Sequence, residues 1–108
     1  MKKTRTESFK KVIKGHKMII KLEGRIENKV PELVKNVEES LGGVDEVVFD
    51  LKTMDSISAA GLRALSTAQH RMRRKMVVKN ASKEVRDFFE ATGYDDILNL
   101  EGRKHRIA

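Results

Sequence analysis

Residues 47–65 read VVFDLKTMDSISAAGLRAL, and this stretch decides how the rest of the sequence is interpreted. Its first five residues, Val47 to Leu51, are mostly apolar and branched, as is typical of a strand buried on both faces. We expect a polar loop of seven residues to follow, and then a helix from about Ala59 to Arg73 with Ser58 as its N-cap. A strand, a loop and a helix in this order form the repeating unit of an α/β protein.

The segments on either side continue the alternation of strands and helices. Strands are predicted at 8–13, 16–26, 47–51 and 76–78, helices at 29–41, 59–73 and 83–92, and a short last strand or turn at 97–100. The first two strands form a hairpin around Gly15. The first helix has Asn28 as its expected N-cap and Pro31 in its first turn, and the last helix begins at Ser82 and ends at Gly93.

These elements predict one α/β domain that spans residues 1–108. We expect a mixed central β-sheet with a βαβαβα core and an N-terminal hairpin, and helices packed on the sheet. The basic segment 102–108 is expected to be a flexible tail.

Composition narrows the class of protein. The chain has no cysteine, which excludes disulfides, redox-active thiols and thiolate metal sites. Its apolar runs are too short to cross a bilayer, and its basic start lacks the apolar segment of a secretory signal. We therefore expect a cytoplasmic protein without membrane insertion.

The start of the helix near Ser58 is the first candidate site. A helix N-terminus exposes free N–H groups and the positive end of the helix dipole, and the small residues Ala59 to Gly61 let another backbone or a phosphate come close. The expected partner-binding residues are Asp55, Ser56, Ile57, Ser58, Ala59, Ala60, Gly61 and Arg63. The alternative remains open that Ser58 only caps the helix and that the small residues only pack against the sheet.

The order of motifs resembles that of the STAS domain family. Asp50-Leu51, followed by Ile57-Ser58-Ala59-Ala60-Gly61-Leu62-Arg63-Ala64-Leu65, is similar to the family's signature. Leu22-Glu23-Gly24-Arg25-Ile26 resembles the strand end before its first helix, and Glu90-Ala91-Thr92-Gly93-Tyr94 the close of its last helix. The family includes bacterial anti-sigma factor antagonists, stressosome proteins and the cytoplasmic domains of sulfate transporters.

The resemblance implies a regulatory binding module rather than an enzyme. An antagonist of this family sequesters an anti-sigma factor that is also a serine kinase, and so releases a sigma factor. The kinase then phosphorylates a serine at the helix start, and the added charge breaks the complex. The resemblance also admits a PP2C-type phosphatase as a further partner, and it implies no cofactor.

This sequence departs from the family at the phosphorylated position, which aligns with Ala59. Alanine has no hydroxyl, so regulation at the usual site is in doubt. Three outcomes stay open: the protein binds its partner constitutively, Ser58 or Ser56 replaces the usual acceptor, or the partner is of another kind. Ser58 is the candidate phosphorylation site.

Other candidate chemistries find little support. The three histidines, His16, His70 and His105, are scattered without metal-ligand spacing. Asp50 and Asp55 bracket the predicted loop, where Asp50 is expected to end the strand by accepting loop N–H bonds. The sequence contains no P-loop and no GxGxxG motif. We therefore expect no catalytic residues, no metal and no cofactor.

Two further functions remain as alternatives. Arg71, Arg73, Arg74 and Lys75 form a basic cluster of the kind that contacts nucleic-acid phosphates, but the chain lacks a set of aromatic side chains for base stacking, so no nucleic acid is expected. A scaffold or accessory subunit of a transporter or signalling assembly is the second alternative. The basic face from Arg63 to Lys75 would then dock on an acidic helix or on anionic lipid.

Overall fold

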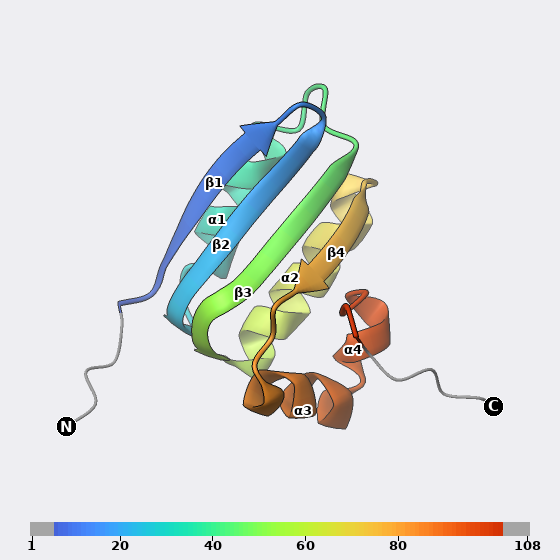
Figure 1. Ribbon diagram of the computed structural model, residues 1–108. Coiled ribbons are helices and arrows are strands. Elements are labelled where there is room, and N and C mark those ends of the chain that lie inside the picture. The colour runs from blue at the N-terminus through green and yellow to red at the C-terminus, as the bar shows by residue number, and fades with distance from the viewer. Residues whose placement is uncertain (1–5, 103–108) are drawn as a thin grey trace.

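Four strands form one mixed sheet in the order β1-β2-β3-β4 in the computed structural model, which describes residues 6–102 (Figure 1). The strands are β1 (Ser8–Lys14), β2 (Lys17–Ile26), β3 (Glu46–Ile57) and β4 (Lys75–Lys79). β1 and β2 pair antiparallel as the predicted hairpin, whereas β2, β3 and β4 are parallel. The predicted mixed sheet with an N-terminal hairpin is therefore confirmed.

The helices are α1 (Val30–Glu38), α2 (Ala59–Met72), α3 (Lys83–Thr92) and α4 (Tyr94–Ile97). Figure 1 shows α1 and α2 behind the sheet and α3 beside the end of the sheet where α2 begins. The other face of the sheet carries no helix among residues 6–102. None of these helices combines the length and the apolar composition needed to cross a membrane.

The hydrophobic core lies between the sheet and the helices that cover it. On β2, Met18, Ile20 and Leu22 are buried and alternate with exposed or half-buried residues, as expected for a strand with one covered face. The helices contribute one face each, including Leu33 of α1, Leu62 of α2 and Phe89 of α3. On α2 the apolar residues of one helix face are buried, namely Leu62, Leu65, Ala68 and Met72.

The largest difference from prediction lies in β3. The expected loop after Leu51 is instead strand, because β3 continues to Ile57. Two register shifts against β2 insert extra residues into β3, near Lys52 and at Asp55. Each bulge moves the next inward residue one position along, so Leu51, Met54 and Ile57 are buried at a spacing of three rather than two. This spacing looked like a loop in the sequence.

Asp50 therefore does not end the strand. It marks the point where β4 leaves β3, since the pairing of these strands ends at Asp50 and Lys79. Asp50 Oδ1 accepts hydrogen bonds from the Lys52 N–H at 3.1 Å and from Asn80 Nδ2 at 3.0 Å. Asp50 thus accepts N–H bonds, as predicted, but it does so where β4 diverges from β3 and not at the start of a loop.

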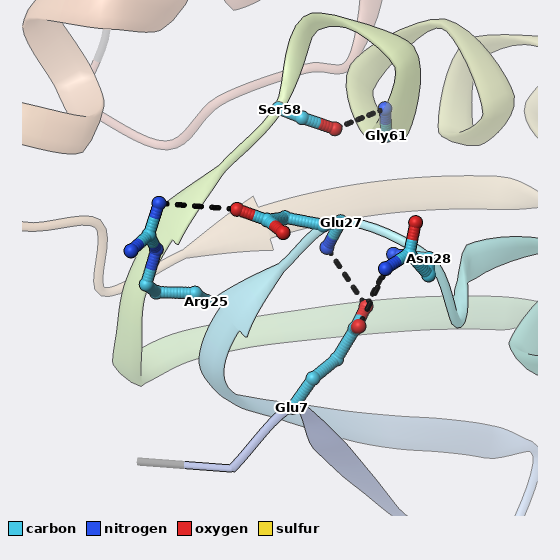
Figure 2. Close-up of polar contacts among 6 residues, drawn as sticks. All are labelled: Glu7, Arg25, Glu27, Asn28, Ser58 and Gly61. Atoms are coloured by element: carbon cyan, nitrogen blue, oxygen red, sulfur yellow. Dashed lines mark hydrogen bonds and ion pairs between the residues drawn. The ribbon is translucent and has the colours of Figure 1, made fainter. Parts of the chain in front are cut away.

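The prediction of Asn28 as the N-cap of α1 was wrong. The N-cap is Lys29, without a side-chain cap, and the helix ends at Glu38 instead of Leu41. The Glu7 carboxylate satisfies the backbone at this entry, because it accepts N–H bonds from Glu27 at 2.8 Å and Asn28 at 3.0 Å (Figure 2). It also accepts the Lys29 N–H at 2.9 Å. Glu7, which precedes β1 in the chain, thus accepts the N–H groups that the Asn28 side chain was expected to help satisfy as an N-cap.

The segment 97–100 is neither a regular strand nor a simple turn. Tyr94–Ile97 form the short helix α4, and Leu100 then makes a single parallel bridge to Val78 of β4. Gly93, which ends α3, has φ +79°, a conformation that glycine adopts without strain. Of the predicted tail 102–108, residues 103–108 lie outside the described residues.

Candidate functional site

The start of α2 is built directly on the end of β3. Ser58 is the only residue between them, and its extended backbone turns the chain from strand to helix. Its N–H donates to the Ile26 carbonyl at 2.9 Å. Its Oγ accepts from the Gly61 N–H at 3.0 Å, as Figure 2 shows. The predicted N-cap role of Ser58 is therefore confirmed, and the cap fixes the first turn of α2 beside the end of β2.

The first turn of α2 presents two small side chains to solvent. Ala59 and Ala60 are exposed and Ser58 is half-buried, whereas Gly61 and Ile57 are buried. A Cβ added to Gly61 would lie 2.9 Å from Ile57 Cγ1, so glycine allows the helix to pack closely on the strand end. The eight predicted residues thus divide: Ile57 and Gly61 shape the turn from inside, and the other six reach the surface.

Two surface hollows flank this turn. One, of about 220 Å³, lies between the end of β3 and the start of α3 and is lined by Asp55, Ser56, Ile57, Glu84, Val85 and Phe88. The other, of about 540 Å³, is a groove between α1 and α2. Ala60 and Arg63 line this groove. The predicted site residues therefore belong to a surface that extends from α3 across the start of α2 to α1.

The groove between α1 and α2 has an apolar floor and a basic rim. Pro31 and Val34 of α1 face Ala60, Ala64 and Ala68 of α2 across it. Its rim carries the cations Lys35, Arg63 and Arg71 and the single acid Glu38. Arg71 pairs with Glu38 at 3.2 Å, whereas Arg63 is exposed and makes no ion pair with any residue in the range 6–102. Arg63 therefore presents an exposed positive charge on the rim of the groove.

The connection between β2 and α1 lies beside the start of α2. The hydrogen bond from the Ser58 N–H to the Ile26 carbonyl joins them. Glu7 binds the backbone of residues 27–29, and Figure 2 shows its contacts with Glu27 and Asn28. Partial burial raises the pKa of the Glu7 carboxyl, but the N–H bonds from Lys29, Asn28 and Glu27 lower it more, so this pKa lies below its ordinary value of 4.5. Glu7 is therefore ionised at neutral pH and keeps this connection in place.

Sequence reasoning missed the contribution of α3. Glu84 and Phe88 line the smaller hollow together with Asp55 and Ser56, and Phe88 is half-buried. Phe89 is fully buried, whereas Phe88 packs against the core from its edge and keeps part of its ring at the surface. Since adjacent residues on a helix point about 100° apart, only one of the two can face the core directly, and this spacing was the available signal.

The discounted chemistries find no geometry among the described residues. Asp50 and Asp55 lie five positions apart on one strand, roughly 15 Å in extended chain, which is too far for a cooperating carboxylate pair. Within residues 6–102, no three histidine, aspartate or glutamate side chains gather as a metal site would require. His16 contacts the Gly43 carbonyl at 3.0 Å, His70 is exposed on α2, and His105 lies outside the described residues.

The basic cluster at the end of α2 is largely occupied by structural contacts. Arg74 donates to the carbonyls of Val44 at 2.7 Å, Met72 at 2.8 Å and Leu41 at 3.3 Å. Lys75 and Arg71 pair with glutamates of β3 and α1. Arg73 adopts φ +52° as the C-cap of α2. The cluster therefore joins elements of this chain, and this use weakens the nucleic-acid alternative.

Comparison with known proteins identifies the fold. The STAS domain model matches residues 7–106. A search of curated protein sequences gave no match. Among solved structures, an anti-sigma factor antagonist from Mycobacterium paratuberculosis aligns with TM-score 0.76 and 16% identity over 91% of this chain and 87% of its own.

Two further structures show how widely this fold occurs. The anti-sigma factor antagonist SpoIIAA in its unphosphorylated form aligns with TM-score 0.70 and 13% identity, over 89% of this chain and 90% of its own. The murine Slc26a9 anion transporter aligns with TM-score 0.66 and 10% identity over 80% of this chain, which corresponds to 16% of the transporter. At these identities the structural matches establish the fold, and the match of the family model over residues 7–106 shows that the chain belongs to the STAS domain family.

Proposed function

We propose that the protein is a non-catalytic regulatory module of the anti-sigma factor antagonist type, which binds an anti-sigma factor in the cytoplasm and so releases a sigma factor. The observation that carries this proposal is the exposed first turn of α2, where Ala59 and Ala60 stand free beside the Ser58 cap. The solved antagonists that share the fold support the same class of function.

The surface fits a protein partner for physical reasons. Small side chains at Ala59 and Ala60 let a partner backbone approach the helix closely, and the positive end of the α2 dipole favours an acidic group there. The hollow beside Phe88 offers a place for an apolar partner side chain, and Arg63 offers a charge for a carboxylate. Asp55 and Ser56 supply polar groups at the edge of the same hollow.

Titration calorimetry tests this proposal. Each ATP-binding anti-sigma factor of the serine-kinase type from the source organism is purified and titrated with the wild-type chain. One of them is expected to bind, and Ala60→Arg is expected to weaken that binding by about tenfold or more. Ala91→Arg is the control. It introduces the same side chain at an exposed position near the C-terminal end of α3, outside the residues that line the two hollows. Binding to none of these proteins, or equal losses in both variants, would reject the proposal.

The complex is expected to form without regulation at the usual phosphorylation position, because Ala59 has no hydroxyl. Ser58 is the nearest alternative acceptor. Its Oγ already accepts the Gly61 N–H, and a phosphate there would add about two negative charges at the docking surface. Incubation with the cognate kinase and ATP, followed by mass spectrometry, tests this point. We expect no phosphate, and phosphate on Ser58 or Ser56 would replace constitutive binding with a switch.

A scaffold role is the second candidate, and the missing acceptor hydroxyl at Ala59 favours it. In that case the groove between α1 and α2, with Arg63 on its rim, docks on an acidic helix of a larger assembly. Co-purification from the native host distinguishes the two functions. A kinase-type anti-sigma factor as the main partner supports the antagonist, whereas a membrane transport complex supports the scaffold.

A further inference from the structure

The uncovered face of the sheet is ordered in three rows that cross all four strands. Each row joins residues that are paired across neighbouring strands. The middle row is Val12, Ile19, Val48 and Val77; one flanking row is Lys14, Lys17, Glu46 and Lys75; the other is Lys10, Lys21, Asp50 and Lys79. The strand and residue spacings make each row about 14 Å long and place it about 7 Å from the next.

The middle row forms an apolar band outside the core. Val48 is buried, at 4% exposure, yet it does not belong to the core cluster that includes its neighbours Val47 and Phe49. Val48 is therefore covered by side chains on the outer face of the sheet. Towards the β1 edge the band opens to solvent, where Val12 is 45% exposed.

The flanking rows are strongly basic. Together they contain six lysines and two acids. Both acids are on the inner strand β3 and are already engaged, since Glu46 pairs with Lys17 and Lys75 at 3.7 Å each. Partial burial raises the pKa of Asp50, but the hydrogen bonds from Asn80 and Lys52 lower it more, so this pKa lies below its ordinary value of 3.8 and Asp50 stays ionised. Lys10 also pairs at 3.5 Å with Glu23, an acid of β2 next to the rows. Six lysines then face three acids, so a positive charge remains around the apolar band.

We propose that this face, defined by the three rows, binds the surface of an anionic lipid bilayer. A lysine is a compact charge on a long flexible stem, which suits dispersed headgroups, and every cation in the rows is a lysine. The stems lie along an apolar surface while the ammonium groups reach into the headgroup layer. The Val12 end of the band then meets the boundary between headgroups and acyl chains.

Other occupants fit this face less well. Nucleic acid would place phosphates over an apolar band, and the rows contain no aromatic side chain for base stacking. Protein interfaces are depleted in lysine, which is the dominant residue here. A second copy of the chain would bring two basic faces together and be repelled.

Vesicle co-sedimentation of the full chain tests the proposal. Vesicles of phosphatidylcholine with about one third phosphatidylglycerol are compared with pure phosphatidylcholine vesicles, at low and at high salt. The wild-type chain is expected to bind only the anionic vesicles and to dissociate at high salt. The double variant Lys10→Gln, Lys14→Gln removes one cation from each flanking row and is expected to bind roughly thirtyfold more weakly.

The matched control is the double variant Lys35→Gln, Arg63→Gln, which removes the same charge from the helix side. Circular dichroism and thermal unfolding establish that both variants fold. Vesicle binding that is lost equally in both variants would reject a specific role of the sheet face, as would the absence of wild-type binding at low salt. Lysine-dependent binding of RNA or polyglutamate without vesicle binding would assign the face to another polyanion and also overturn the proposal.

This inference does not depend on the anti-sigma partner. The rows lie on the face opposite α1 and α2, whereas the proposed docking surface begins at the first turn of α2 (Figure 1). Loss of vesicle binding in the sheet variants with retained partner binding is the expected pattern. Failure of vesicle binding would leave the proposed function untouched.

Discussion

At the residue scale, Ser58 shapes the proposed docking surface by capping α2. Its Oγ accepts the Gly61 N–H, so Ser58→Ala is expected to lower the free energy of unfolding by about 1 kcal/mol. Ser58→Asp keeps an acceptor and adds a negative charge at the helix N-terminus, so its stability should remain near that of the wild-type chain. Urea denaturation measures both. A Ser58→Ala variant as stable as the wild-type chain would show that the cap has no energetic role.

Gly61 is expected to be a structural position. Gly61→Val would place its Cβ 2.9 Å from Ile57 Cγ1 at a buried site, and we expect a loss of about 1–3 kcal/mol in unfolding free energy. Ala60→Val, at the exposed neighbouring position, should cost less than about 1 kcal/mol because only helix propensity changes. The two unfolding midpoints in urea give the comparison. Similar midpoints would mean that Ile57 moves aside without cost.

Glu7 gives a pH-dependent prediction. Its pKa is lowered by the fold, so its stabilisation is fully present above the ordinary value of 4.5 and disappears as pH falls through the lower folded value. Glu7→Ala should therefore destabilise the protein by about 1 kcal/mol at pH 7 and by clearly less near pH 2, where the protonated Glu7 carboxyl of the wild-type chain has lost its charge and keeps one acceptor oxygen. Glu7→Gln keeps one acceptor oxygen, so at pH 7 its unfolding free energy should lie between that of the wild-type chain and that of Glu7→Ala. Unfolding curves at the two pH values test this, and a pH-independent loss would contradict it.

At the scale of elements, the sequence predicted what depends on local pattern. The hairpin, the helices and the Ser58 and Ser82 caps follow from periodicity and capping residues, and Ser82 Oγ accepts the Val85 N–H at 3.2 Å. Two features depend on distant partners and were missed. The bulges of β3 exist only against β2, and the N–H groups at the entry to α1 are satisfied by Glu7 from across the hairpin.

Arg74 links the connection between α1 and β3 to the C-terminal end of α2, and its substitution tests how much this link stabilises the fold. Its guanidinium bonds the carbonyls of Leu41 and Val44, in the connection from α1 to β3, and of Met72 at the end of α2. Arg74→Met leaves these carbonyls without their donor and is expected to cost about 1–3 kcal/mol. Arg71→Met breaks an exposed ion pair with Glu38 and should cost less than about 1 kcal/mol. Thermal unfolding distinguishes the two, and equal melting temperatures would contradict the structural role of Arg74.

At the scale of the whole molecule, the fold gives its two faces different chemistry. One face of the sheet carries α1 and α2, and the exposed turn of α2 lies at its end; the other face carries the lysine rows. The sequence located the exposed turn correctly because it is contiguous. The contribution of Glu84 and Phe88, and the alignment of the rows, needed the tertiary structure, because they join residues from separate elements.

The position of the docking surface is the central claim, and nuclear magnetic resonance tests it directly. The amide spectrum of the isotope-labelled 108-residue chain is recorded before and after addition of the anti-sigma factor that binds it. We expect shifted or broadened signals at residues 55–63 and 84–88, and unchanged signals at Val12, Ile19 and Val77. Changes confined to the sheet face, with the start of α2 undisturbed, would contradict the claim.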